Sequence, residues 1–155
     1  MRIVAMSDCH NRISPVETAI EKSKPDVFIY CGDGSAKVED ISYLYPDIRF
    51  YIVKGNCDFG EYPLEQEIKL GSKVVFFTHG HIYSVKGGYN KIISEGKRRN
   101  ADIVIFGHTH IAVNEYIDGM YLVNPGSASL PNFGRPSYAF IDISDKGISV
   151  NSVEL

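Results

Sequence analysis

The sequence contains no long hydrophobic segment. Its apolar runs are only a few residues long, far short of the roughly 20 that span a bilayer. Residues 2–6 form a strand-like run, and lack the basic region, apolar stretch and small-residue cleavage site of a leader peptide. We therefore expect no membrane association and a cytoplasmic location.

Cysteine is scarce, and its positions form no recognisable pattern. Cys9, Cys31 and Cys57 include no CxxC pair, and an odd number of cysteines does not indicate a disulfide framework in a small chain. We expect all three thiols to be reduced.

The chain also lacks an excess of positive charge. Its formal net charge is −3, which disfavours broad electrostatic binding to nucleic acid. The one basic cluster, at 97–99, ends a predicted helix, where cations complement the negative end of the helix dipole. We therefore expect no nucleic-acid partner.

No repeat, low-complexity tract or linker divides the 155 residues, which predicts a single domain, 1–155. Unbroken apolar runs of strand length indicate strands buried on both faces. We expect helices from Ser14, as N-cap of a capping box, to about Ser23, and over about 36–44 and 88–99. The predicted strands are 3–6, 27–30, 50–53, 74–77 and 103–106.

The last third of the chain predicts two hairpins. Segments 111–117 and 120–123 flank Asp118-Gly119, a dipeptide favoured in tight turns between antiparallel strands. Segments 137–143 and 147–153 flank a second turn at 144–146. We predict a single-domain α/β sandwich of mixed sheets flanked by helices, with an antiparallel sheet packed against a parallel one.

Each of the five apolar runs is followed within a few residues by a side chain that can bind a metal. The carboxyl ends of parallel strands meet at one edge of a sheet, so these side chains should converge there. Any one of them alone is better explained as a turn residue. That explanation does not account for four of the five histidines sharing one edge with two aspartates and an asparagine. The predicted ligands are Asp8, His10, Asp33, Asn56, His79, His108 and His110.

The ligand types restrict the metal. Imidazole, carboxylate and amide oxygen suit Mn, Fe, Zn, Co or Ni better than Ca or Mg, and no thiolate is in the set. Seven ligands exceed one tetrahedral ion and suffice for two ions with open positions. Two divalent ions can activate water and clamp the oxygens of an in-line phosphoryl displacement. We expect manganese, with Ni, Fe, Co and Zn as alternatives.

The ordered motifs resemble the calcineurin-like metallophosphoesterase superfamily, and within it the small YfcE-like phosphodiesterases. They are Asp8-x-His10, Gly32-Asp33, Gly55-Asn56-Cys57-Asp58, Thr78-His79-Gly80-His81 and Gly107-His108-Thr109-His110, followed by Asn124-Pro125-Gly126-Ser127. The resemblance spans almost the whole chain. It implies hydrolysis of phosphate esters, most of all phosphodiesters, by a hydroxide bridging two divalent metals, without a phosphoenzyme.

The resemblance also implies roles for individual residues. Asp8, His10, Asp33 and His110 would hold one ion, and Asp33, Asn56, His79 and His108 the other. Asp33 would bridge the pair, and Asn56 would also touch the substrate. His81 lies outside both sets, so a phosphate contact, a contact to a metal-bound side chain and a purely structural role all stay open.

Cys57 departs from the family pattern. Many members have at this position a histidine that helps to protonate the leaving group, and general-acid help is worth about 10²–10⁴ in rate. We therefore predict that activated aryl phosphodiesters are cleaved far better than alkyl ones.

Three other functions compete with this hypothesis. A phosphomonoesterase could use the same metals, and a retromer subunit of similar fold is a non-catalytic protein-interaction scaffold with a degenerate site. A nuclease is disfavoured because the chain has no basic groove or capping domain. Aromatic residues at Tyr43, Tyr45 and Phe59 could form a homo-oligomer interface or cover an edge of the core.

Overall fold

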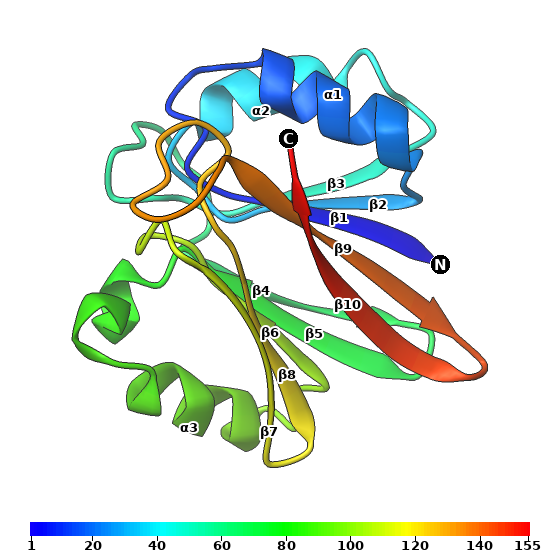
Figure 1. Ribbon diagram of the computed structural model, residues 1–155, viewed down its shortest axis with the longest axis vertical. Helices are drawn as coiled ribbons and strands as arrows, with labels where there is room; N and C mark the ends of the chain where they lie inside the picture. The colour runs from blue at the N-terminus through cyan, green and yellow to red at the C-terminus, as the bar shows by residue number, and fades with distance from the viewer.

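The computed structural model describes residues 1–155 and contains two five-stranded sheets that face each other (Figure 1). Helices α1 and α2 cover the outer face of one sheet and α3 that of the other (Figure 1). The elements in chain order are β1 (Arg2–Met6), α1 (Ser14–Ser23), β2 (Val27–Tyr30), α2 (Ser35–Ser42), β3 (Arg49–Ile52), β4 (Glu65–Leu70), β5 (Lys73–Thr78), η1 (His81–Tyr83), η2 (Val85–Gly87), α3 (Asn90–Arg98), β6 (Ile103–Ile105), β7 (Ala112–Ile117), β8 (Met120–Pro125), β9 (Ser137–Ser144) and β10 (Gly147–Glu154).

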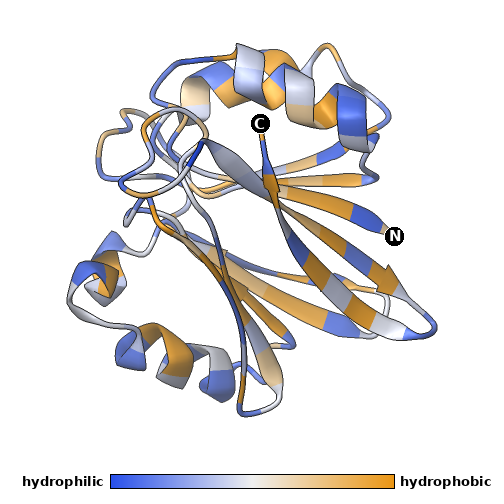
Figure 2. Ribbon diagram, viewed as in Figure 1, coloured by the Kyte–Doolittle hydropathy of each residue, from blue (hydrophilic) through white to orange (hydrophobic).

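The unbroken apolar runs arise because each central strand contributes to two different cores. In β1, Ile3 and Ala5 face the space between the sheets, whereas Val4 and Met6 pack under α1 and α2. The strands of the second sheet divide in the same way, with Phe77 in the space between the sheets and a third core under α3. Hydropathy colouring shows the apolar residues concentrated on the strands and on the inner sides of the helices (Figure 2).

The predicted α/β sandwich of mixed sheets flanked by helices is confirmed, but the expectation that an antiparallel sheet packs against a parallel one is wrong. The first sheet has the order β10-β9-β1-β2-β3, and the second has the order β4-β5-β6-β8-β7. Strands β1, β2 and β3 are mutually parallel in the first sheet, as are β5, β6 and β8 in the second. Each hairpin extends a different sheet, since β9 pairs antiparallel with β1, whereas β8 pairs parallel with β6. Both sheets are therefore mixed.

The helices agree with the predicted positions, but the predicted capping box at Ser14 does not form. Helix α1 begins at Ser14, and no side chain caps it. The carbonyl of Ile13 accepts the N–H groups of Val16 and Glu17, so the backbone satisfies the first turn. None of the helices is long and apolar enough to cross a membrane.

The two predicted hairpins are confirmed. Asp118 and Gly119 have φ of 50° and 90°, the left-handed pair that a type I′ turn requires. Among the aromatic residues, Tyr43 and Phe59 are 76% and 92% exposed, whereas Tyr45 packs against the core under the helices.

Candidate metal centre

All seven predicted ligands lie in loops at the carboxyl ends of parallel strands. Asp8 and His10 follow β1, Asp33 follows β2, and Asn56 follows β3 in the first sheet. In the second sheet, His79 follows β5, and a single loop after β6 carries His108 and His110. The two sheets bring these loops together at one end of the molecule (Figure 1).

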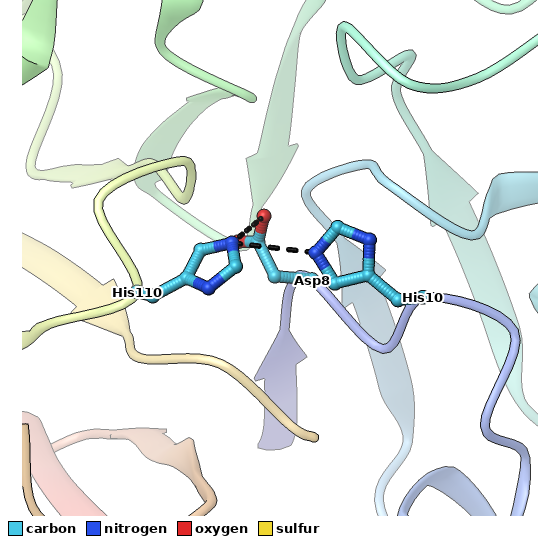
Figure 3. Close-up of side chains that lie close together, drawn as sticks. All are labelled: Asp8, His10 and His110. Atoms are coloured by element: carbon cyan, nitrogen blue, oxygen red, sulfur yellow. Dashed lines mark hydrogen bonds and ion pairs between the residues drawn. The ribbon is translucent and has the colours of Figure 1, made fainter. Parts of the chain in front are cut away.

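The first group of ligands consists of Asp8, His10 and His110, whose side chains point toward one another (Figure 3). His110 Nε2 lies 3.0 Å from Asp8 Oδ1 and 3.3 Å from His10 Nε2. Asp8 is fully buried, whereas both histidines are half-buried. The Asp8 carboxylate is therefore the most buried of the three side chains, and the two imidazoles lie closer to solvent.

The second group surrounds His79, which is fully buried. Its Nε2 lies 3.0 Å from Asn56 Oδ1, 3.2 Å from His108 Nδ1 and 3.6 Å from Asp33 Oδ2. The ligand atoms of Asp8, Asp33 and His79 also lie within 4.8 Å of one another. The two groups are therefore continuous, and the structure brings all seven predicted ligands together.

Backbone carbonyls determine which ring nitrogens are free. His79 Nδ1 lies 2.6 Å from the carbonyl oxygen of Cys31, and His110 Nδ1 lies 2.7 Å from that of Leu130. A carbonyl oxygen only accepts, so each Nδ1 carries a proton, and each Nε2 faces the centre with a lone pair that is available whenever the ring is neutral. Metal-binding histidines in proteins are commonly held by their second nitrogen in this way.

These lone pairs point at other acceptors. His110 Nε2 faces a carboxylate oxygen, and His79 Nε2 faces an amide oxygen and a second carboxylate. The buried Asp8 Oδ1 atom has no hydrogen-bond partner. Opposed lone pairs repel unless a proton or a cation lies between them, so this donor set fits divalent metal ions.

The close packing of these groups shifts the pKa values of several of them. The pKa of Asp8 is lowered: burial alone would raise it, but His110 and His79 outweigh burial. Burial, with His79 and Lys86, lowers the pKa of His108 to about 4, whereas the contact with Asp8 raises the pKa of His110. The His108 ring is therefore neutral at physiological pH.

The ligands also have unusual backbone conformations. Five of the seven have positive φ: Asp8 (56°), His10 (44°), Asp33 (61°), His108 (68°) and His110 (58°). Such left-handed non-glycine residues are uncommon and cluster at functional sites, where the surrounding structure enforces them.

Gly32, Gly55 and Gly107 directly precede predicted ligands, and the space around these three glycines restricts them more than their backbone conformation does. Only Gly32 has positive φ, at 92°. A Cβ on Gly55 would collide with the backbone and carboxylate of Asp33, and one on Gly107 would collide with Ser7 and with the carboxylate of Asp8. Residues of the neighbouring loops therefore leave no room for a side chain at either position.

Asp58, a residue to which no motif gives a role, ties two of the loops that carry predicted ligands together. Its Oδ2 accepts hydrogen bonds from the N–H groups of Asp33 and Gly55 and from the Ser35 hydroxyl, at 2.6–2.8 Å. Its Oδ1 accepts the N–H groups of Gly34 and Ser35 at 2.7 and 2.9 Å. Burial alone would raise the pKa of Asp58, but these hydrogen bonds outweigh it and lower the pKa. Its position directly after Asn56-Cys57 was the only signal in the sequence.

The late motif supports the histidine loop. Asn124 donates hydrogen bonds to the carbonyl of Gly107 and to the Thr109 hydroxyl, both at 3.0 Å. The Ser127 hydroxyl donates to the carbonyl of Asp8 at 2.8 Å. The motif therefore connects the loops after β1 and β6 and is more than a turn.

The remaining candidates lie beside the ligands. The His81 ring centroid is 5.4 Å from that of His79 and 6.1 Å from that of His108, and its buried Nδ1 has no hydrogen-bond partner. Cys57 is exposed, and its sulfur lies in a group with His10 and Asp33. Cys9 and Cys31 are buried in the cores.

The chain matches a known protein family and several individual proteins over much of its length. The family model of the calcineurin-like phosphoesterase superfamily domain matches residues 1–146. A probable metallophosphoesterase, YsnB of Bacillus subtilis, is 32% identical over 97% of this chain and 89% of its own length. The phosphodiesterase YfcE of Escherichia coli is 32% identical over 58% of this chain and 50% of its own length.

A solved structure supports the fold over the full length. The predicted phosphoesterase from Streptococcus pneumoniae superposes with a TM-score of 0.84 at 30% identity, covering 99% of this chain and 88% of that one. The family match includes every predicted ligand, since all seven lie between residues 8 and 110. The chain therefore belongs to the calcineurin-like phosphoesterase superfamily.

Proposed function

We propose that this protein hydrolyses phosphodiesters with two divalent cations held by the seven clustered side chains. The observation that supports this most directly is the convergence of lone pairs around His79 and His110, whose Nδ1 atoms are both committed to backbone carbonyls. The side chains would divide between the ions as the family resemblance implies, with Asp33 shared. We propose manganese as the ion to test first, because nitrogen and oxygen donors suit it.

When bound, two such ions supply an activated water and neutralise the charge that develops on the phosphoryl oxygens. The two ions would bring four positive charges to two carboxylates, those of Asp8 and Asp33. The centre would therefore attract a phosphate ester even though the chain has a formal net charge of −3.

The side chains of this protein have separate tasks in that reaction. Asn56 is exposed at the opening, so its amide can contact both an ion and the substrate. His81 lies against His79 and His108 with an unpartnered Nδ1, which we assign to a contact with the phosphate. Asp33 accepts the N–H of Cys57 at 2.8 Å, which orients its carboxylate between the groups.

The experiment is to strip the purified protein of metal, reload it with Mn²⁺, and measure both metal content and hydrolysis. A bis-aryl phosphodiester and the matching aryl phosphomonoester are compared side by side. Two ions per chain with faster diester cleavage support the proposal. Asp33→Asn should abolish activity, whereas Asp40→Asn, an exposed acid on α2, should not change it.

The other outcomes identify the competing functions. Faster cleavage of the monoester would make the protein a phosphomonoesterase with the same centre. Failure to retain stoichiometric metal, together with no hydrolysis of either ester, would favour the non-catalytic scaffold.

A further inference from the structure

Cys57 differs from the other two cysteines in its surroundings. Cys9 and Cys31 are buried, and Cys9 Sγ lies 2.9 Å from the hydroxyl of Tyr30. Cys57 is exposed, and its Sγ, a nitrogen of His10 and a carboxylate oxygen of Asp33 all lie within 4.8 Å of one another. Of the three thiols, only that of Cys57 lies in a group with two predicted metal ligands.

The position of the Cys57 thiol is fixed by its neighbours. Its backbone N–H donates to Asp33 Oδ1 at 2.8 Å, and the side-chain amide of Asn56 donates to its sulfur at 3.3 Å. Asp58, the next residue, holds the loop through five hydrogen bonds to residues 33–35 and 55. The thiol therefore stands at the edge of the centre in a defined place, and is not on a loose surface turn.

We propose that Cys57 is an eighth metal ligand. It would join His10 and Asp33 at the first position, which is the one that Asp8, His10, Asp33 and His110 would form. The thiolate would give this position a preference for zinc, cobalt or iron over manganese and magnesium. This inference rests on the proposed two-metal function and refines it. Thiolate is a softer ligand than imidazole or carboxylate, so it favours the ions that bind sulfur well. The S–H bond breaks as the S–metal bond forms, and the proton leaves to solvent.

As a ligand, Cys57 would select for ions that bind sulfur well, which the nitrogen and oxygen ligands do not do. The seven nitrogen and oxygen donors can bind most divalent transition ions, with affinities that generally rise from Mn²⁺ to Cu²⁺. A change in ligand type is one way to alter that selectivity. A thiolate would add to one position a sulfur donor that the other position lacks. We therefore expect one position to retain its ion more tightly than the other.

The test is a titration of the metal-stripped, full-length protein with Co²⁺, followed by absorption spectroscopy. Sulfur bound to Co²⁺ gives a charge-transfer band in the near ultraviolet, which is separate from the visible d–d bands that any ligand set produces. We expect this band in the wild type and its loss in Cys57→Ser, with the d–d bands retained. Circular dichroism before titration confirms that the variant is folded.

Affinity provides a second measurement that does not depend on activity. Substitution even of groups that only support metal ligands costs about 10–100-fold in affinity, so we expect Cys57→Ser to weaken Co²⁺ binding at the first position by at least about tenfold. Binding of Mn²⁺ should change far less. Co²⁺ that binds to the wild type without the sulfur band would overturn the ligand assignment and leave the proposed function intact. A wild type that retains no Co²⁺ would overturn both.

Discussion

Asp58 offers the sharpest test of how the centre is held together. Replacing it by asparagine preserves size and shape but changes one carboxylate oxygen into an NH₂ group. With the amide oxygen at the Oδ1 position, the N–H groups of Asp33 and Gly55 lose their acceptor; with the amide reversed, those of Gly34 and Ser35 lose theirs. Either orientation therefore leaves two backbone donors facing a third donor.

The expected loss of stability follows from that count. Each buried donor left without an acceptor costs about 1–3 kcal/mol, which gives about 2–6 kcal/mol for two. Asp58 is only half-buried, so water relieves part of the loss, and we expect about 2–4 kcal/mol. For a chain of about this size, this corresponds to a decrease in Tm of about 4–16 °C.

The assay is urea unfolding of the metal-stripped wild type and of Asp58→Asn, so that bound ions do not contribute. Asp40→Asn, an exposed acid on the same side of the first sheet, serves as the control and should leave the midpoint unchanged. The m-value should stay constant, since the same surface is exposed on unfolding. A loss below about 1 kcal/mol for Asp58→Asn would refute the reasoning, because it would mean that the five hydrogen bonds do not hold the loops.

Three further predictions concern chemistry, packing and pH. With Mn²⁺ bound, Cys57→His should raise the rate of hydrolysis of alkyl phosphodiesters by at most about 10²–10⁴-fold, which is the usual contribution of a general acid. The rate on aryl phosphodiesters should stay nearly unchanged, and equal effects on both classes would contradict the leaving-group argument. Asn124→Ala should cost about 2–4 kcal/mol in urea unfolding, because its buried amide makes three hydrogen bonds, whereas Asn151→Ala on exposed β10 should cost little. Arg98 and then Arg99 lower the pKa of Glu95 to about 2 from an ordinary 4.5, so this contribution to stability is present above pH 4.5 and disappears as pH falls toward 2. The stability difference between wild type and Glu95→Gln, measured at a series of pH values, should shrink over that range, and a constant difference would contradict the assignment.

The sequence was sufficient to locate most of the strands and to predict which side chains converge at one edge, because both leave local signals. An unbroken run such as 3–6 is apolar at every position since alternate residues enter different cores. The same property hides which sheet a run belongs to, because a strand buried on both faces looks alike in either one. The division of parallel strands between two sheets was therefore not predictable from periodicity.

Other features left no usable local signal. Strand β4 (Glu65–Leu70) is a charged edge strand of the second sheet, and its polar positions resemble a loop. The roles of Asp58 and Cys57 depend on contacts with residues more than twenty positions away, which a short motif does not reveal. An acid or a thiol after an asparagine is ordinary in a turn, and only its partners distinguish it.

The arrangement of the ligands explains why a small chain can afford so many unfavourable local conformations. Each left-handed non-glycine ligand costs of order 1–3 kcal/mol and persists only where the surroundings enforce it. Here both backbone and side-chain groups supply the enforcing contacts: the carbonyl of Leu130 accepts the Nδ1–H of His110, the N–H of His108 donates to Asp8 at 3.0 Å, and the Asp58 carboxylate accepts the N–H of Asp33. Substitution of a supporting side chain such as Asp58 should therefore disturb the predicted ligands. The remaining unfavourable contacts are the opposed lone pairs themselves, and a divalent cation relieves those, so the strain that the fold retains at this edge is strain that metal binding would remove.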